Sequence, residues 1–219
     1  MRGRAGRRWG WGPLLLCAAA ALAQEKGPAP PPAAAPPVPP ATVTVLMQTA
    51  LGNIVLALES DRAPITVGNF LHYVDQKRFD GVTFYRAMKV DEQGQYGIIQ
   101  GGLRGNPKRV FKPIAHEPTT TTGLSHTNGA ISMARADPGT ANADFFIVIG
   151  DLVSLDAQPD TADPGYAVFG HVVDGMDVVH AILDQPRAED AGEGVMKGQM
   201  LATPVKILTV RRAEPAPRP

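Results

Sequence analysis

The sequence predicts one β-rich domain built as a closed barrel with helical caps, and three observations support this prediction. Short apolar segments with period-two alternation recur between Gly- and Pro-rich stretches, which is typical of strands joined by turns. Helical periodicity is confined to two segments far apart in the chain. The chain has 219 residues, of which 44% are hydrophobic, enough to form a packed core without membrane burial.

The first elements are a hairpin and a helix. Residues 42–49 and 53–58 alternate in polarity on either side of a glycine turn, which indicates two paired strands. A helix is expected to begin at Pro64, where the missing backbone N–H costs little in the first turn. Its apolar stripe has helical spacing and consists of Val67, Phe70, Leu71 and Val74.

The rest of the domain alternates strands with longer connections. A second helix is predicted to start near Met176, and Pro186 ends it. The remaining strands are predicted at residues 82–88, 97–100, 130–134, 145–149, 167–172 and 204–212. Residues 103–123 and 187–202 are predicted to be long loops, which are often functional in compact domains.

The ends of the chain differ in composition from this domain. Four arginines within the first eight residues precede an apolar run, and the sequence Ala21-Leu22-Ala23 fits a signal-peptidase site. We expect residues 1–23 to be a signal peptide, 24–41 a Pro/Ala-rich linker, 42–212 the folded domain and 213–219 a disordered tail. Retention as a membrane anchor and lipidation at Cys17 remain alternatives, although Leu16 does not fit a lipoprotein signal.

Composition and motifs argue against several function classes. The 21 basic and 21 acidic side chains balance, so charge gives no reason to expect a nucleic acid partner. Cys17 is the one cysteine, which excludes an internal disulfide and a Cys-rich metal site. Ser125-His126 lies outside any Gly-x-Ser-x-Gly motif, so a hydrolase triad is not predicted. No histidine has metal-ligand spacing, and we expect structural or exposed roles for His72, His116, His126, His171 and His180.

Six ordered elements resemble the cyclophilin-type peptidyl-prolyl cis/trans isomerases, and in particular their bacterial periplasmic members. Three of them are Phe84-Tyr85-Arg86, Ile99-Gln100-Gly101-Gly102 and the segment Asn128-Gly129-Ala130-Ile131-Ser132-Met133-Ala134. The others are Asp144-Phe145-Phe146-Ile147, Leu155-Asp156 and Tyr166-Ala167-Val168-Phe169-Gly170, followed by the helix start Val173-Asp174-Gly175-Met176. A single Gln-Gly-Gly would be weak evidence, whereas the full series spans roughly residues 44–212 in the order that the family shows.

The resemblance implies a fold and an activity. The fold is a closed antiparallel eight-stranded β-barrel capped by two α-helices. The activity is isomerisation of X–Pro bonds in folding exported proteins. The resemblance also implies a periplasmic location and a monomer that needs no cofactor or metal. Its partners are proline-containing segments, with no nucleic acid and no membrane after signal cleavage.

The resemblance also implies a site. Twisting an X–Pro bond breaks amide resonance without changing any covalent bond, so preorganised donors and an apolar slot are sufficient. Arg86 and Gln100 are the expected catalytic residues, because Arg offers a rigid, always charged fork of donors. The expected substrate-binding residues are Phe146, Ile98, Ala134, Arg135, Leu155 and Tyr166. Arg86 is otherwise an ordinary strand arginine, and Phe146, Ile98 and Leu155 ordinary core residues.

Departures from the family pattern generate further expectations. Gly97 stands where many relatives carry a pocket Phe, which predicts a weaker apolar wall. Ser154 stands where cyclosporin-sensitive relatives carry Trp, which predicts weak cyclosporin binding. Asp144 replaces a Gln and is expected to draw Arg86 or Arg135 into an ion pair.

The departures leave two other functions open. One is a module on the same fold that binds Pro-containing segments with little turnover, which the altered pocket would favour. The other is an adhesin that uses the linker as a stalk, for which export is the only support.

Overall fold

The computed structural model describes residues 41–158, 160 and 163–213. The predicted signal peptide, the linker up to residue 40 and the tail beyond residue 213 lie outside the described residues. Within the described part, none of the helices has the length and apolar character that a bilayer crossing requires.

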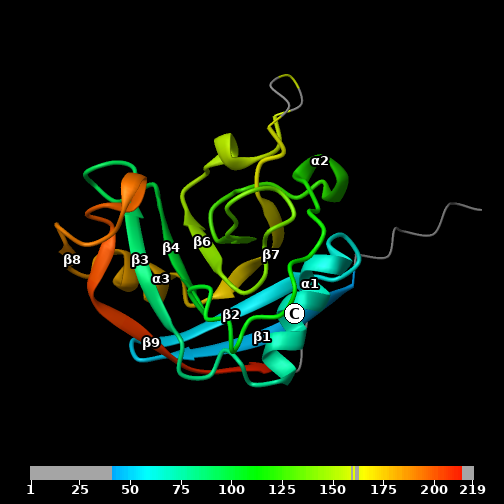
Figure 1. Cartoon of the computed structure of the whole chain (residues 1–219), viewed down its shortest axis with the longest axis horizontal. Helices are drawn as coiled ribbons and strands as arrows, with labels where there is room; N and C mark the ends of the chain where they lie inside the picture. Colours follow the sequence, from blue (N-terminus) through cyan, green and yellow to red (C-terminus); the bar gives the residue numbers. More distant parts are fainter. Residues whose placement is uncertain (1–40, 159, 161–162, 214–219) are drawn as a thin grey trace, which may run out of the picture. The chain divides into compact units, whose positions relative to one another are not determined.

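Eight antiparallel strands form a closed barrel (Figure 1). They neighbour one another in the order β1-β2-β7-β5-β6-β4-β3-β9, and pairing of β1 with β9 closes the ring. Their bounds are β1 Thr42–Thr49, β2 Gly52–Glu59, β3 Thr83–Lys89, β4 Gly97–Gly102, β5 Ala130–Met133, β6 Phe145–Ile149, β7 Ala167–Asp174 and β9 Met200–Arg212. The predicted eight-stranded barrel is confirmed. A two-residue strand, β8 (Arg187–Ala188), is added on β9.

Two helices cover the barrel, and Figure 1 shows α1 beside β2 and α3 beside β3 and β4. The first, α1 (Pro64–Asp75), buries the predicted stripe and packs against β2, β7 and β9. The second, α3 (Met176–Leu183), buries Val179, Ile182 and Leu183. Both helices form where the apolar period is 3.6, because only this period places all apolar residues on one face.

The two predicted long loops contain short elements. Residues 103–123 include α2 (Thr119–Thr122), and residues 187–202 include β8 and the 3-10 turn η3 (Gly194–Met196). A further 3-10 turn, η1, spans Val153–Leu155. The last strand begins at Met200, earlier than predicted, because it pairs there with both β3 and β8. Such long-range pairing leaves no local signal in the sequence.

The barrel interior is an aromatic cluster centred on Phe145 of β6. This ring is fully buried, and it meets the rings of Phe70, Phe79 and Phe84 edge-on at centroid distances of 5.6, 5.6 and 5.9 Å. Edge-to-face contacts add to the hydrophobic gain of burial. Because β6 alternates, burying Phe145 inside directs Phe146 to the outer face of the barrel.

Replacing Phe145 with Ala should lower the free energy of unfolding by about 3–5 kcal/mol, since it removes a large buried ring at the centre of the cluster. Urea denaturation of the folded domain measures this change. Leu208→Ala is the matched control, because Leu208 of β9 is 47% exposed and should cost under about 0.5 kcal/mol. Equal losses in the two variants would contradict this description of the core.

Candidate active site

A β-bulge in β3 determines where Arg86 points. Phe84 pairs with Gly101 of β4, whereas Arg86 pairs with the adjacent Gln100, so the register shifts at Tyr85. Strict alternation would place Arg86 on the same inner face as Phe84. The extra residue instead brings Arg86 to the outer face beside Gln100, and bulges re-aim side chains in this way next to functional sites.

Two glutamine oxygens hold the Arg86 guanidinium. Its Nε and Nη2 donate to Gln199 Oε1 at 2.8 and 2.6 Å, and its Nη1 donates to Gln100 Oε1 at 2.7 Å. Nη2 also lies 3.7 Å from Met88 Sδ. Four of the five N–H groups thus meet acceptors, while the fifth, on Nη1, meets none in the described part of the chain.

Arg86 stays charged despite its burial, and its partner Gln100 is held in place. Burial lowers the pKa of its guanidinium, but an arginine remains protonated under all ordinary conditions. Gln100 is itself oriented, because its Nε2 donates to the hydroxyl of Tyr85 at 2.8 Å. Burial raises the pKa of Tyr85, so this hydroxyl stays neutral.

A pocket of about 650 Å³, hereafter the Arg86 pocket, lies against this group. All eight predicted site residues line it together, namely Arg86, Ile98, Gln100, Ala134, Arg135, Phe146, Leu155 and Tyr166. The roles given to these residues stay predictions. Its other lining residues are Met88, Gly105, Ala136, Thr140, Asn142, Asp144, Val195 and Met196.

The apolar wall of the Arg86 pocket is built around Phe146. The Tyr166 ring meets the Phe146 ring edge-on, with centroids 5.5 Å apart. The Arg135 guanidinium lies 4.8 Å from the centre of the Tyr166 ring, and its Nε donates to Gly165 O at 3.1 Å. Leu155 adjoins this wall, because Tyr166 N donates to Leu155 O at 3.0 Å. Arg135 therefore braces Tyr166 as well as lining the pocket.

Gln199 is a site residue that the sequence did not reveal. It lies just before β9, in a predicted loop. Its Nε2 donates to Val195 O at 2.8 Å, and its Oε1 accepts hydrogen bonds from Nε and Nη2 of Arg86. It therefore links Arg86 to the η3 turn, whose Val195 lines the Arg86 pocket with 87% of its surface exposed. The only signal in the sequence was the length of the segment 187–202. That length indicated a functional loop but did not indicate which of its residues takes part.

Two expectations about departures from the family pattern are wrong. Gly97 does not line the Arg86 pocket: a Cβ there would lie 2.5 Å from Met88 O and 3.1 Å from Leu183 Cδ1 of α3. It therefore removes no pocket wall. Asp144 forms no ion pair with Arg86 or Arg135 among the described residues. Its Oδ1 accepts the N–H of Arg104 at 2.8 Å, and burial raises its pKa.

Ser154 of η1 is exposed and does not line the Arg86 pocket, in contrast to its neighbour Leu155. The predicted weak binding of cyclosporin stays a prediction.

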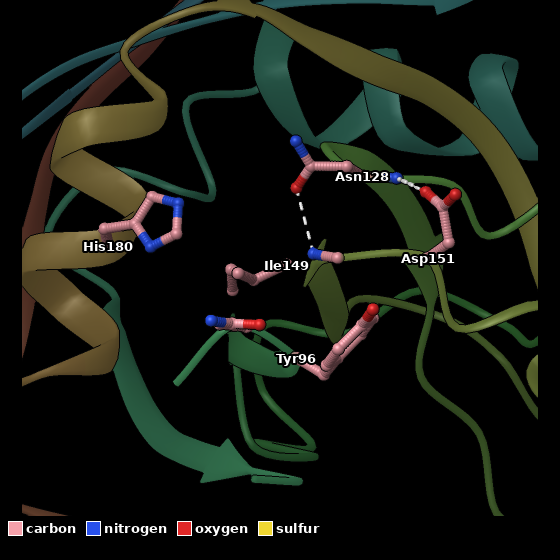
Figure 2. Close-up of a pocket in the computed structure, with 7 residues that line it drawn as sticks. Tyr96, Asn128, Ile149, Asp151 and His180 are labelled. Atoms are coloured by element: carbon pink, nitrogen blue, oxygen red, sulfur yellow. Dashed lines mark hydrogen bonds between the residues drawn. The ribbon is translucent and has the colours of Figure 1, made fainter. Parts of the chain in front are cut away.

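A second pocket, of about 450 Å³, contains none of the predicted residues (Figure 2). Asn128 and Asp151 are engaged with the backbone of the chain: Asn128 N donates to Asp151 Oδ1 at 2.8 Å, and Gly150 N donates to Asn128 Oδ1 at 3.0 Å. His180 of α3 faces the opening from the other side (Figure 2). Asn128 and Asp151 thus stabilise a turn, and we assign no chemistry to this pocket.

The chain matches one family of known proteins over most of its length. The model of the family "Cyclophilin type peptidyl-prolyl cis-trans isomerase/CLD" matches residues 44–212. A peptidyl-prolyl cis-trans isomerase of Acinetobacter baylyi is 36% identical over 174 residues, which cover 78% of this chain and 86% of the relative. Peptidyl-prolyl cis-trans isomerase B of Escherichia coli is 36% identical over 140 residues, which cover 63% of this chain and 82% of that relative.

The solved structures show the same fold. A crystal structure of a Cryptosporidium parvum cyclophilin type isomerase, determined in the presence of the dipeptide Ala-Pro, matches with a TM-score of 0.62 at 21% identity. The match covers 78% of this chain and 99% of that one. The chain belongs to the cyclophilin-type peptidyl-prolyl cis-trans isomerase family. It is an isomerase of the peptide bond preceding proline, and enzymes of this class act on proline-containing peptides.

Replacing Gln199 with Leu should lower the isomerisation rate at saturating peptide about tenfold, because Arg86 loses the acceptor shared by Nε and Nη2. Peptide affinity should change little, since the apolar wall is untouched. Exchange NMR on an Ala-Pro peptide measures both quantities.

Gln185→Leu is the matched control for Gln199→Leu. Its amide also donates to a backbone carbonyl, Ala181 O, but lies at the end of α3. A Gln199→Leu rate within about twofold of wild type would contradict the role of Gln199 in holding Arg86.

Proposed function

We propose that the chain accelerates isomerisation of X–Pro bonds in exported proteins as they fold in the periplasm, and that the reaction takes place in the Arg86 pocket. The observation that supports this most strongly is the fixed Arg86 guanidinium. It keeps one Nη1 N–H without an internal acceptor, at the edge of an apolar slot walled by Phe146.

In this proposal the apolar wall holds the proline ring while the preceding peptide unit rotates. Phe146, Ile98 and Leu155 supply the apolar contact, and Tyr166 adds an aromatic edge. A crystal structure of a relative was determined in the presence of Ala-Pro. A dipeptide of this kind is small enough for a pocket of about 650 Å³.

Arg86 lowers the barrier in the same proposal. As the amide twists, its resonance is lost and the prolyl nitrogen regains a localised lone pair. The open Nη1 N–H of Arg86 donates to that nitrogen, while Gln100 and Gln199 keep the guanidinium oriented. A donor oriented in advance favours the twisted state, because no reorganisation is needed when it forms. No nucleophile or proton transfer is required.

The binding-only alternative loses its main argument. It rested on a pocket weakened at Gly97, and a side chain at Gly97 would point toward Leu183 instead of the Arg86 pocket.

Replacing Arg86 with Ala should lower the catalysed rate about 10²- to 10³-fold, the range for losing a preorganised donor to a developing charge or lone pair. A protease-coupled assay or exchange NMR on an Ala-Pro peptide measures the rate. Arg212→Ala is the control, because Arg212 pairs with Asp75 on the exposed surface and should leave the rate unchanged.

Two results of the Arg86 experiment would count against the proposal. Wild-type protein that binds the peptide without accelerating exchange would favour the binding-only alternative. An Arg86→Ala variant as fast as wild type would remove Arg86 from the mechanism.

Export is supported by the arginine-rich start and the Ala21-Leu22-Ala23 pattern. The full chain produced in a bacterium with two membranes should appear in the periplasmic fraction with a mass corresponding to a start at Gln24. An intact mass in the membrane fraction would indicate an anchor, and a lipid adduct on Cys17 would indicate a lipoprotein. Either result would contradict cleavage after Ala23.

A further inference from the structure

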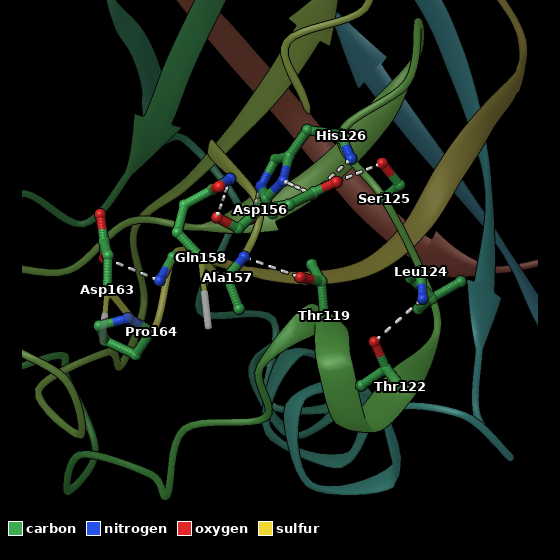
Figure 3. A network of polar contacts seen from close by, with 12 residues as sticks. Thr119, Thr122, Leu124, Ser125, His126, Asp156, Ala157, Gln158, Asp163 and Pro164 are labelled. Carbon is green, nitrogen blue, oxygen red and sulfur yellow. Dashed lines mark hydrogen bonds and ion pairs between the residues drawn. The ribbon is translucent and has the colours of Figure 1, made fainter. Parts of the chain in front are cut away.

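A polar cluster around the fully buried His126 lies directly behind the Arg86 pocket. It consists of Ser125, His126, Ser132 and Asp156, hereafter the His126 cluster. His126 has no exposed surface, its Nδ1 lies 2.5 Å from Asp156 Oδ1, and its Nε2 lies 3.0 Å from Ser132 Oγ. Figure 3 shows His126, Asp156 and Ser125 turned toward one another.

The partners of Asp156 determine the tautomer of His126. Oδ1 also accepts the backbone N–H of His126 at 3.0 Å, and Oδ2 accepts the hydroxyl of Ser125. An ionised carboxylate can only accept, so Nδ1 of His126 carries the proton and Nε2 accepts from the Ser132 hydroxyl. Burial lowers the pKa of His126, which keeps the ring neutral near pH 7.

The order Ser132–His126–Asp156 has the geometry of a nucleophilic triad, but it cannot serve as one. Ser132 is fully buried on β5 and does not line the Arg86 pocket, so its hydroxyl has no access to substrate. A triad serine must reach the scissile carbonyl. An effect of the cluster on the Arg86 pocket therefore has to pass through the residues that pack against it.

Those neighbours are the walls of the Arg86 pocket. The His126 ring lies parallel to the Phe146 ring, with an interplanar angle of 7° and centroids 5.9 Å apart, and the Tyr166 ring meets it edge-on at 6.5 Å. Asp156 directly follows Leu155, and Leu152 N donates to His126 O at 2.8 Å. One histidine thus joins β6, the η1 turn and the segment before β7.

We infer that His126 and Asp156 form a positioning pair that fixes Phe146 and Leu155, and thereby sets the affinity of the Arg86 pocket for a proline ring. The inference rests on the proposed function, because it takes this pocket as the place where proline binds. It assigns His126 no contact with substrate.

Positioning by this pair predicts a specific kinetic pattern. Phe146 and Leu155 contact the proline ring alike in the planar and the twisted state, so loosening them weakens binding in both. Affinity should fall while the rate at saturation stays constant. Loss of Arg86 orientation has the opposite pattern, which separates the two effects.

The experiment compares Asp156→Ala with Thr119→Val in the full-length protein. Thr119 Oγ1 accepts Ala157 N–H at 2.9 Å, so Thr119→Val removes a hydrogen bond one residue beyond Asp156 and leaves the contacts of His126 with Asp156 and Phe146 in place. NMR titration with an Ala-Pro peptide gives the dissociation constant, exchange NMR gives the saturated rate, and imidazole ¹⁵N shifts report the His126 tautomer.

For Asp156→Ala we expect a dissociation constant about tenfold higher, a saturated rate within about twofold of wild type, and loss of the Nδ1–H tautomer. For Thr119→Val we expect wild-type values. Unchanged affinity in folded Asp156→Ala, or an equal loss in Thr119→Val, would overturn the inference.

If Asp156→Ala does not fold, the peptide affinity of Asp156→Asn tests the inference instead. The amide oxygen of Asn is a weaker acceptor on a side chain of the same shape. A weakened affinity of about two- to fivefold supports the inference, and an unchanged affinity overturns it. A wild-type protein that binds peptide without isomerising it would refute the proposed function alone, since the affinity comparison would still stand.

Discussion

The active site depends on the register shift at Tyr85, where β3 gains one residue relative to β4. Without it, the guanidinium of Arg86 would enter the aromatic interior around Phe145, where a charge has no partner and burial is costly. With it, Arg86 stands on the outer face between two amide oxygens, those of Gln100 and Gln199. The barrel thus holds β3 and β4 rigid, and the bulge directs the Arg86 side chain to the outer face.

Two separate supports surround the Arg86 pocket. On one side, the chain Tyr85–Gln100–Arg86–Gln199 orients the donor that we propose acts on the twisted bond. On the other side, His126 lies parallel to Phe146 and is held by Asp156. Because the two networks share no hydrogen bond among the described residues, orientation of the donor and shape of the apolar wall are separable properties.

Local pattern was enough to predict most of the fold, but less of the site. The alternation of residues 53–58 and the stripe of α1 depend on neighbours in sequence, so both were predicted correctly. The eight pocket residues came from the ordered family motifs. The bulge at Tyr85, the contact of Gln199 with Arg86 and the loop contact of Asp144 arise from long-range pairing, which no local period encodes. The prediction for Gly97 was wrong because the motif gives the position of this residue in the sequence but not the direction in which a side chain there would point.

In the proposed mechanism, a fixed planar fork, and not positive charge alone, lowers the barrier to rotation about the X–Pro bond. The most direct measurement is the exchange rate of a saturating Ala-Pro peptide with Arg86→Lys, which keeps the charge but cannot engage Gln100 and Gln199 as a planar fork does. We predict a rate at least about tenfold below wild type with similar peptide affinity. A lysine variant as fast as wild type would contradict it.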